Sequence, residues 1–176
     1  MNPMLQRLLV AAGLVLVLGG ANWTIRERER LIADGSPLLL ELAPADPRSL
    51  MQGDYMALRF AIAQQIWPGN RFGALGGKDD RPPDGIAVVK RNEKGVGSFV
   101  RLHDGQAIAA NESLIRYRLR KHDVRIVTNA WFFQEGTAQE FSQARYGEFR
   151  VAPNGEALLV ALRDKDLKVL GSRTRP

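Results

Sequence analysis

The 176-residue chain contains no cysteine and only two histidines, His103 and His122. The absence of cysteine excludes a thiol nucleophile, a CxxC redox pair, a lipid-modified N-terminal cysteine and any cysteine-bound zinc. Two histidines are too few for a metal site built from several imidazoles. We therefore expect no metal site and no cofactor.

Acidic residues are fewer than basic ones, so the net charge is +6 and the pI is about 10.1. A basic balance suits nucleic acid or an anionic membrane surface. The aromatic residues alternate toward the predicted core and do not follow a basic groove, which argues against nucleic acid. For a chain that is tethered near head groups, the bilayer is the expected partner.

Charged residues are also missing from a long N-terminal stretch, the 18 residues from Leu8 to Ile25. At about 1.5 Å per residue, a helix of this length reaches roughly 27 Å, close to the thickness of the hydrocarbon layer. Trp23 lies where an interfacial aromatic residue is expected. We predict a transmembrane helix. The alternative is a cleaved signal peptide, with Gly19 and Ala21 at the small-residue positions before the cut.

The stretch after this run predicts where the anchor ends. Residues 24–34 contain no helix breaker, so the helix is expected to continue until Gly35. The predicted division is an anchor with a juxtamembrane helix over 1–34 and a single domain over 35–176. Basic residues on both sides of the span, Arg7 before it and Arg26, Arg28 and Arg30 after it, leave its orientation open.

Short apolar or alternating segments separated by turn residues predict that the domain is mostly β, a β-sandwich or a barrel-like sheet with one or two short helices. The turn at His122-Asp123 makes 116–133 a hairpin, and Asn154-Gly155 makes a second hairpin. Residues 61–66 fit either a helical turn or the tail of a strand, and 134–145 fit a helix. The predicted strands are 55–60, after a turn at Gly53-Asp54, and 38–42, 86–90, 98–102, 113–121, 124–133, 147–151, 157–162 and a last short one over 165–171. Residues 67–85 are a Gly- and Pro-rich loop.

One motif is specific. Residues 53–60 read GDYMALRF, which resembles the signature of the GDYXXLXY family of bacterial membrane-anchored proteins. Phe60 replaces the final Tyr, which keeps the ring and loses the hydroxyl. The resemblance extends to residues 46–50, 132–136 and 144–151. The motif and these segments supply the candidate functional residues Gly53, Asp54, Tyr55, Leu58, Phe60, Glu135 and Tyr146.

The resemblance carries expectations about location and partners. It implies a short single-pass anchor in the cytoplasmic membrane, with the domain on the extracytoplasmic side. It also implies association with a multi-spanning membrane protein. It implies no catalytic activity.

A weaker similarity points to type I signal peptidases, in which a catalytic Ser precedes a Gly-Asp strand. Here the corresponding offset falls on Ala45, which has no nucleophilic atom, and Ser49 is out of place. Lys90 lies on a later strand, where a base could sit. Without the Ser this chemistry fails.

Carboxylates offer a different chemistry. Asp54, Glu135 and Tyr146 could form the site of a hydrolase-like enzyme if their side chains converge in one cleft. The structural alternative is that Asp54 bonds backbone N–H groups of a turn and Glu135 precedes or caps the following helix.

A basic ridge is predicted on one strand, where Arg116, Arg118 and Arg120 alternate with inward-facing residues. These arginines could bind lipid phosphates, or they could simply be a solvated strand face. The leading hypothesis is a non-enzymatic, membrane-anchored module that acts with another membrane protein. The alternatives are the hydrolase-like enzyme and a domain that binds lipid head groups.

Overall fold

The structure is a computed structural model, and it describes residues 3–43, 51–52, 55–67, 84–120 and 123–171. The chain divides into two compact units, Met1–Asp34 and Gly35–Pro176. The two units are described separately below.

The first unit is one long helix, α1 (Pro3–Asp34). It ends at Asp34, which confirms the stop that Gly35 predicted. Large apolar side chains along it are exposed, among them Leu16 at 77% and Trp23 at 75%. Within the described part of the chain, no helix meets the length and apolarity that crossing a membrane requires.

The second unit is mostly β, as predicted. Its short helical elements are α3 (Ala61–Ile66) and a 3-10 turn, η2 (Ala138–Phe141). The strands are β1 (Ser36–Glu41), β2 (Met51–Gln52), β3 (Tyr55–Ala57), β4 (Gly85–Arg91), β5 (Gly97–Leu102), β6 (Glu112–Arg120), β7 (Asp123–Ile126), β8 (Ala130–Phe132), β9 (Tyr146–Val151) and β10 (Ala157–Arg163).

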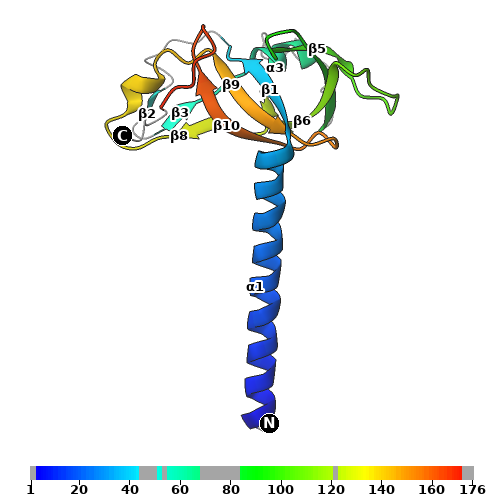
Figure 1. Cartoon of the computed structure of the whole chain (residues 1–176), viewed down its shortest axis with the longest axis vertical. Coiled ribbons are helices and arrows are strands. Elements are labelled where there is room, and N and C mark those ends of the chain that lie inside the picture. The colour runs from blue at the N-terminus through cyan, green and yellow to red at the C-terminus, as the bar shows by residue number, and fades with distance from the viewer. Residues whose placement is uncertain (1–2, 44–50, 53–54, 68–83, 121–122, 172–176) are drawn as a thin grey trace, which may run out of the picture. The chain divides into compact units, whose positions relative to one another are not determined.

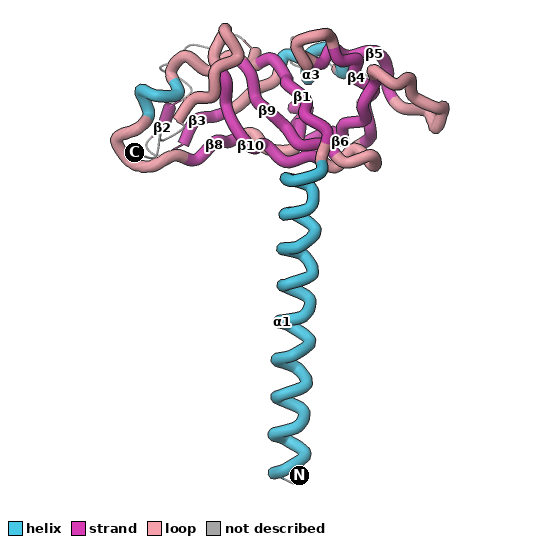
Figure 2. Tube along the Cα trace, in the orientation of Figure 1, coloured by secondary structure: helices cyan, strands magenta, loops and turns pink. Residues whose placement is uncertain are grey.

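These strands form antiparallel sheets whose orders are β1-β9-β10, β2-β3-β8 and β5-β4-β6-β7 (Figure 1). The first and last sheets meet at two places. Leu39 bridges Val96, and the Arg116 N–H donates to the Gly155 carbonyl oxygen at 2.9 Å. These contacts bring the two sheets together into a half-barrel, and Figure 2 shows their strands in magenta.

Alternation along the strands builds the core. On β6, Ile115 and Tyr117 are buried while Arg116 and Arg118 are exposed, which confirms the predicted period of two. On β9, the fully buried Phe149 meets Phe60 edge to face, with ring centroids 5.2 Å apart. The motif segment thus contributes directly to the centre of the domain.

The predicted hairpin over 116–133 is correct only as far as Ile126. Val127 adopts φ 57°, a left-handed conformation that a β-branched residue rarely takes. The chain leaves β6 at this point, and β8 pairs with β3 in a different sheet. The second hairpin, β9 and β10, forms as predicted, with Gly155 at φ 83° in its turn.

Other predicted boundaries also change. The helix expected over 134–145 is only the four residues of η2, preceded by Gly136 at φ 81°. The last strand expected over 165–171 is a single bridge between Arg163 and Val169. Residues 61–66, which fitted either a helical turn or the tail of a strand, form a helix. Most of the loop predicted over 67–85 lies outside the described residues.

The close approach at Gly147 gives a stability prediction. A Cβ added there would lie 2.9 Å from Cε1 of the buried Phe60 and 3.0 Å from Cδ1 of Leu159, which packs against the core. We expect Gly147→Ala to lower the free energy of unfolding by about 1–3 kcal/mol, measured by urea unfolding of the full chain with tryptophan fluorescence. In a Phe60→Leu background the same change should cost less, because the clashing ring is gone. An equal cost in both backgrounds would contradict this packing.

Candidate functional site

The motif segment runs from β3 to α3. Gly53 and Asp54 lie outside the described residues, so the site is built from Tyr55 onward. Backbone bonds hold the segment on both sides. The Leu58 N–H donates to the Asn129 carbonyl oxygen at 2.7 Å, and the Ala43 N–H donates to the Arg59 carbonyl oxygen at 2.7 Å.

The motif residues divide into two groups by burial. Leu58 and Phe60 are core residues, each only 3% exposed. Tyr55 is half-buried, and its ring centroid lies 5.9 Å from that of Phe132, which is 75% exposed. The segment therefore stabilises the core at one end and forms an aromatic surface at the other.

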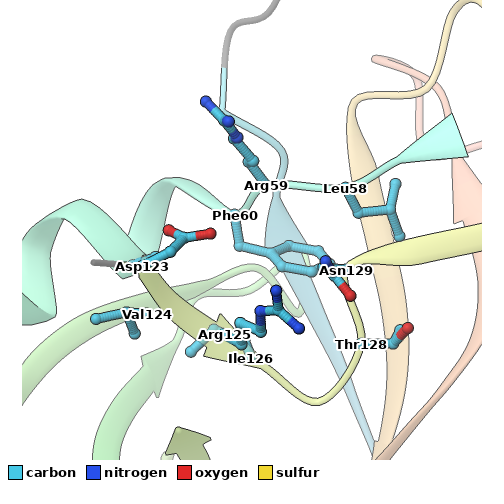
Figure 3. A pocket seen from close by; sticks show the side chains of 10 residues that line it. Leu58, Arg59, Phe60, Asp123, Val124, Arg125, Ile126, Thr128 and Asn129 are labelled. Carbon is cyan, nitrogen blue, oxygen red and sulfur yellow. The ribbon is translucent and has the colours of Figure 1, made fainter. Parts of the chain in front are cut away.

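A small hollow lies beside the buried end of the segment (Figure 3). Its volume is about 20 Å³, room for about one water molecule. Its apolar wall includes Leu58, Phe60 and Ile126. The polar groups around it are Arg59, Asp123, Arg125, Thr128 and Asn129.

Of the three candidates for a hydrolase-like site, the structure describes Glu135 and Tyr146. Glu135 is exposed in the loop after β8, and Tyr146 begins β9, where it pairs with Glu41 of β1 and Arg163 of β10. Between residues that the structure describes, no hydrogen bond or ring contact joins Glu135 to Tyr146. The third member, Asp54, lies outside the description. In the same part of the chain, no group of three His, Cys, Asp or Glu residues could hold a metal ion.

The predicted basic ridge is exposed, but two of its three members have partners within the domain. Arg120 forms an ion pair with Asp84 at 3.2 Å, and Arg116 Nε donates to the Asn154 carbonyl oxygen at 3.2 Å. Arg118 lies directly opposite Arg125 across the β6-β7 ladder. Among the described residues, only the charge of Arg120 is thus compensated by an ion pair, whereas the Arg116 side chain is held by a neutral carbonyl oxygen.

Asp84, which directly precedes β4, bonds to the end of β6 at Leu119 and Arg120. Its Oδ1 accepts from the Leu119 N–H at 2.7 Å. This hydrogen bond holds the pKa of the Asp84 carboxyl below its ordinary value of 3.8, and the nearby positive charges of Arg120 and Arg118 lower it further.

A buried ion pair was not predicted. Glu148, only 8% exposed, lies on β9 and accepts from Arg163 Nε at 2.7 Å. The Arg163 Nη2 to Glu148 Oε2 distance is also 2.7 Å. The register of the hairpin around Asn154-Gly155 was the available signal, since it places both residues on one face of adjacent strands. Phe132, which the sequence pattern placed more readily in the core, is exposed, and the contact between its ring and that of Tyr55 was not predicted.

The chain belongs to the GDYXXLXY family, because the family model described as GDYXXLXY protein matches residues 17–162. This span covers most of the chain and includes every motif position described above. No curated protein and no solved structure matches the chain.

The Asp84 geometry predicts a pH dependence. A carboxyl whose pKa is depressed by folding contributes stability above its unfolded pKa and loses it as the pH falls through the folded value. We expect Asp84→Asn to be less stable than the wild type at pH 7, with the difference closing as the pH drops below 3.8. Urea unfolding at a series of pH values measures this, with Asp166→Asn as the surface control. A difference that is the same at pH 7 and at low pH would contradict the assignment.

Proposed function

We propose that this protein is a membrane-anchored, non-enzymatic module whose domain binds another membrane protein on the extracytoplasmic side of the cytoplasmic membrane. The observation that carries the proposal is the exposed Phe132, which extends the motif residue Tyr55 into an aromatic surface. Large exposed aromatic residues are favoured as anchors of protein interfaces.

The anchor would be α1. The 18 residues from Leu8 to Ile25 carry no charge, and Trp23, near the end of this run, lies where the interface would be. Exposed apolar side chains such as Leu14, Val15 and Leu16 follow one another along the sequence, so they point in different directions around the helix. A helix that is apolar all round requires an apolar environment, which a bilayer supplies.

The partner surface would be the sheet that carries the motif strand. In the strand order of that sheet β8 comes last, so Phe132 lies at its margin among the described residues. Tyr55 and Phe132 face each other across the β3-β8 ladder. Their two adjoining rings form an aromatic patch. A single exposed aromatic residue would need no explanation, but a patch of this kind suggests a contact surface.

Two alternatives have less support. A hydrolase-like site would need Glu135 and Tyr146 to converge, and among the described residues no hydrogen bond or ring contact joins them. A lipid-head-group surface would need the arginine ridge to be free, and Arg116 and Arg120 are held by Asn154 and Asp84. A non-enzymatic binding role needs only the aromatic surface of Tyr55 and Phe132 and the uncharged run of α1.

Photo-crosslinking in cells tests the partner surface. A photoreactive phenylalanine analogue placed at Phe132 should crosslink to a membrane protein, because this side chain would lie inside the interface. The same analogue at Lys165, which is also exposed, is the control and should not yield that product. Identical products from both positions, or no membrane-protein product from position 132, would overturn this surface.

A reporter fusion tests the topology. Alkaline phosphatase fused after Pro176 should be active, since the enzyme matures only outside the cytoplasm, and a reporter that fluoresces only in the cytoplasm should stay dark. The opposite reporter pattern would show that the domain faces the cytoplasm.

Replacing Leu14 and Leu16 by Arg should abolish membrane retention, because two charges in the middle of a span are costly.

A further inference from the structure

The loop between β5 and β6, residues 103–111, exposes a run of apolar side chains. Four consecutive residues of this loop are both apolar and exposed, namely Ala107, Ile108, Ala109 and Ala110. Ile108 is the largest of them and is 38% exposed. A run of three or four consecutive exposed apolar residues is unfavourable for a folded domain unless it serves a contact. We call these four residues the apolar tip.

The sheet order explains why the chain needs this loop but not why its tip is apolar. β5 and β6 both pair antiparallel with β4, which lies between them, so β5 and β6 run in the same direction. The loop therefore has to carry the chain back along the sheet before β6 begins. Every residue from Asp104 to Asn111 is exposed, and the buried core that the described residues form contains none of them.

Polar contacts hold both ends of the loop. At its start, Arg101 Nη1 lies 3.1 Å from Asp104 Oδ1, and the same oxygen accepts from the Gln106 N–H at 3.3 Å. At its end, Glu112 Oε2 accepts from the Ala109 N–H at 3.0 Å, and the Glu112 N–H donates to the Ala109 carbonyl oxygen at 2.9 Å. These bonds restrain the backbone that carries the apolar tip, and a restrained loop loses less freedom on binding than an unrestrained one.

The flanks of the apolar tip are polar and uncharged. Gln106 precedes the tip and Asn111 follows it, and both residues are exposed. Within the described part of the chain, neither side-chain amide makes a hydrogen bond, so both can bond to the backbone of a partner. An apolar centre with polar groups at its edge is the usual arrangement of a protein interface.

The composition of the loop fits a protein groove better than a bilayer. Segments that insert among head groups combine large apolar or aromatic side chains with Lys or Arg. Residues 105–111 contain no aromatic and no charged residue. The three alanine side chains of the apolar tip bury little surface in a bilayer, but their small size allows close packing against a protein surface.

We propose that the apolar tip inserts into an apolar groove on the membrane protein that the domain binds. Ile108 fills the groove, while Gln106 and Asn111 bond to backbone groups at its rim. This inference rests on the proposed function for the existence of that partner. It adds a second contact on another sheet, because Tyr55 and Phe132 belong to the β2-β3-β8 sheet.

Photo-crosslinking beside the apolar tip tests the contact and leaves the tip unaltered. The photoreactive phenylalanine analogue at Gln106 should crosslink in cells to the same membrane protein as the analogue at Phe132, whereas the analogue at Lys165 should not. Adding Ile108→Ser should lower the yield from position 106 at least fivefold, because the side chain that fills the groove is lost. Val100→Ser makes a similar change at an exposed residue of β5 outside the loop and should leave the yield unchanged.

A stability measurement separates this binding role from a structural one. Because Ile108 is exposed and lies outside the core, Ile108→Ser should lower the urea midpoint of the purified full chain no more than Val100→Ser does. A larger fall for Ile108→Ser would show that the domain itself needs this side chain, and it would overturn the proposal.

The crosslinking outcomes distinguish this contact from the proposed function. A product from position 132 without one from position 106, or a product from position 106 that Ile108→Ser does not diminish, overturns the groove contact and leaves the proposed function standing. Failure of both wild-type crosslinks overturns both proposals. Products from position 106 that contain lipid, or a second copy of this chain, in place of the membrane protein overturn the choice of partner.

Discussion

The packing of Phe60 against Phe149 is the contact on which the rest of the domain depends. Phe149 lies on β9, which pairs with β1 on one side and β10 on the other, so it occupies the centre of that sheet. Phe60 reaches it across Gly147, where a side chain would leave no room for the ring. The final aromatic position of the family motif is thereby a core position, and Phe in place of Tyr retains the ring that this contact needs.

The same contact links the core to the surface. Because Leu58 and Phe60 are buried, the backbone between them points Arg59 outward. The bond from Leu58 to Asn129 then holds the strained turn after β7 beside Arg59. Tyr55, at the start of the segment, meets Phe132 on β8. One short segment therefore sets the positions of a core ring, an exposed arginine and an aromatic patch.

The parts of the fold that depend on local pattern were predictable from the sequence. The alternation on β6 and the Asn-Gly turn between β9 and β10 are local signals, and both elements formed as expected. The split between β7 and β8 was not predictable, because Val127 reads as a strand residue but adopts φ 57°, and β8 then pairs with β3, which is distant in the sequence. The helix expected over 134–145 was shortened because Gly136 takes a positive φ.

The candidate site shows the same limit. Tyr55, Leu58 and Phe60 were identified by the motif, but their division into core and surface residues needed the three-dimensional packing. Arg59 and Arg125 come from different elements, and no spacing in the sequence brings them together. Of the three ridge arginines that the sequence singled out, Arg116 and Arg120 have partners in the domain that a strand pattern cannot reveal.

The central claim is that the face formed by β8 and the turn after β7 is the side of the domain that meets a partner. Hydrogen-deuterium exchange of the full chain, compared between native membranes and the purified protein, tests it most directly. The account predicts slower exchange in native membranes for amides of residues 123–132, with β5 unchanged as the internal reference. Equal exchange over 123–132 in both preparations, or protection confined to β5, would contradict it.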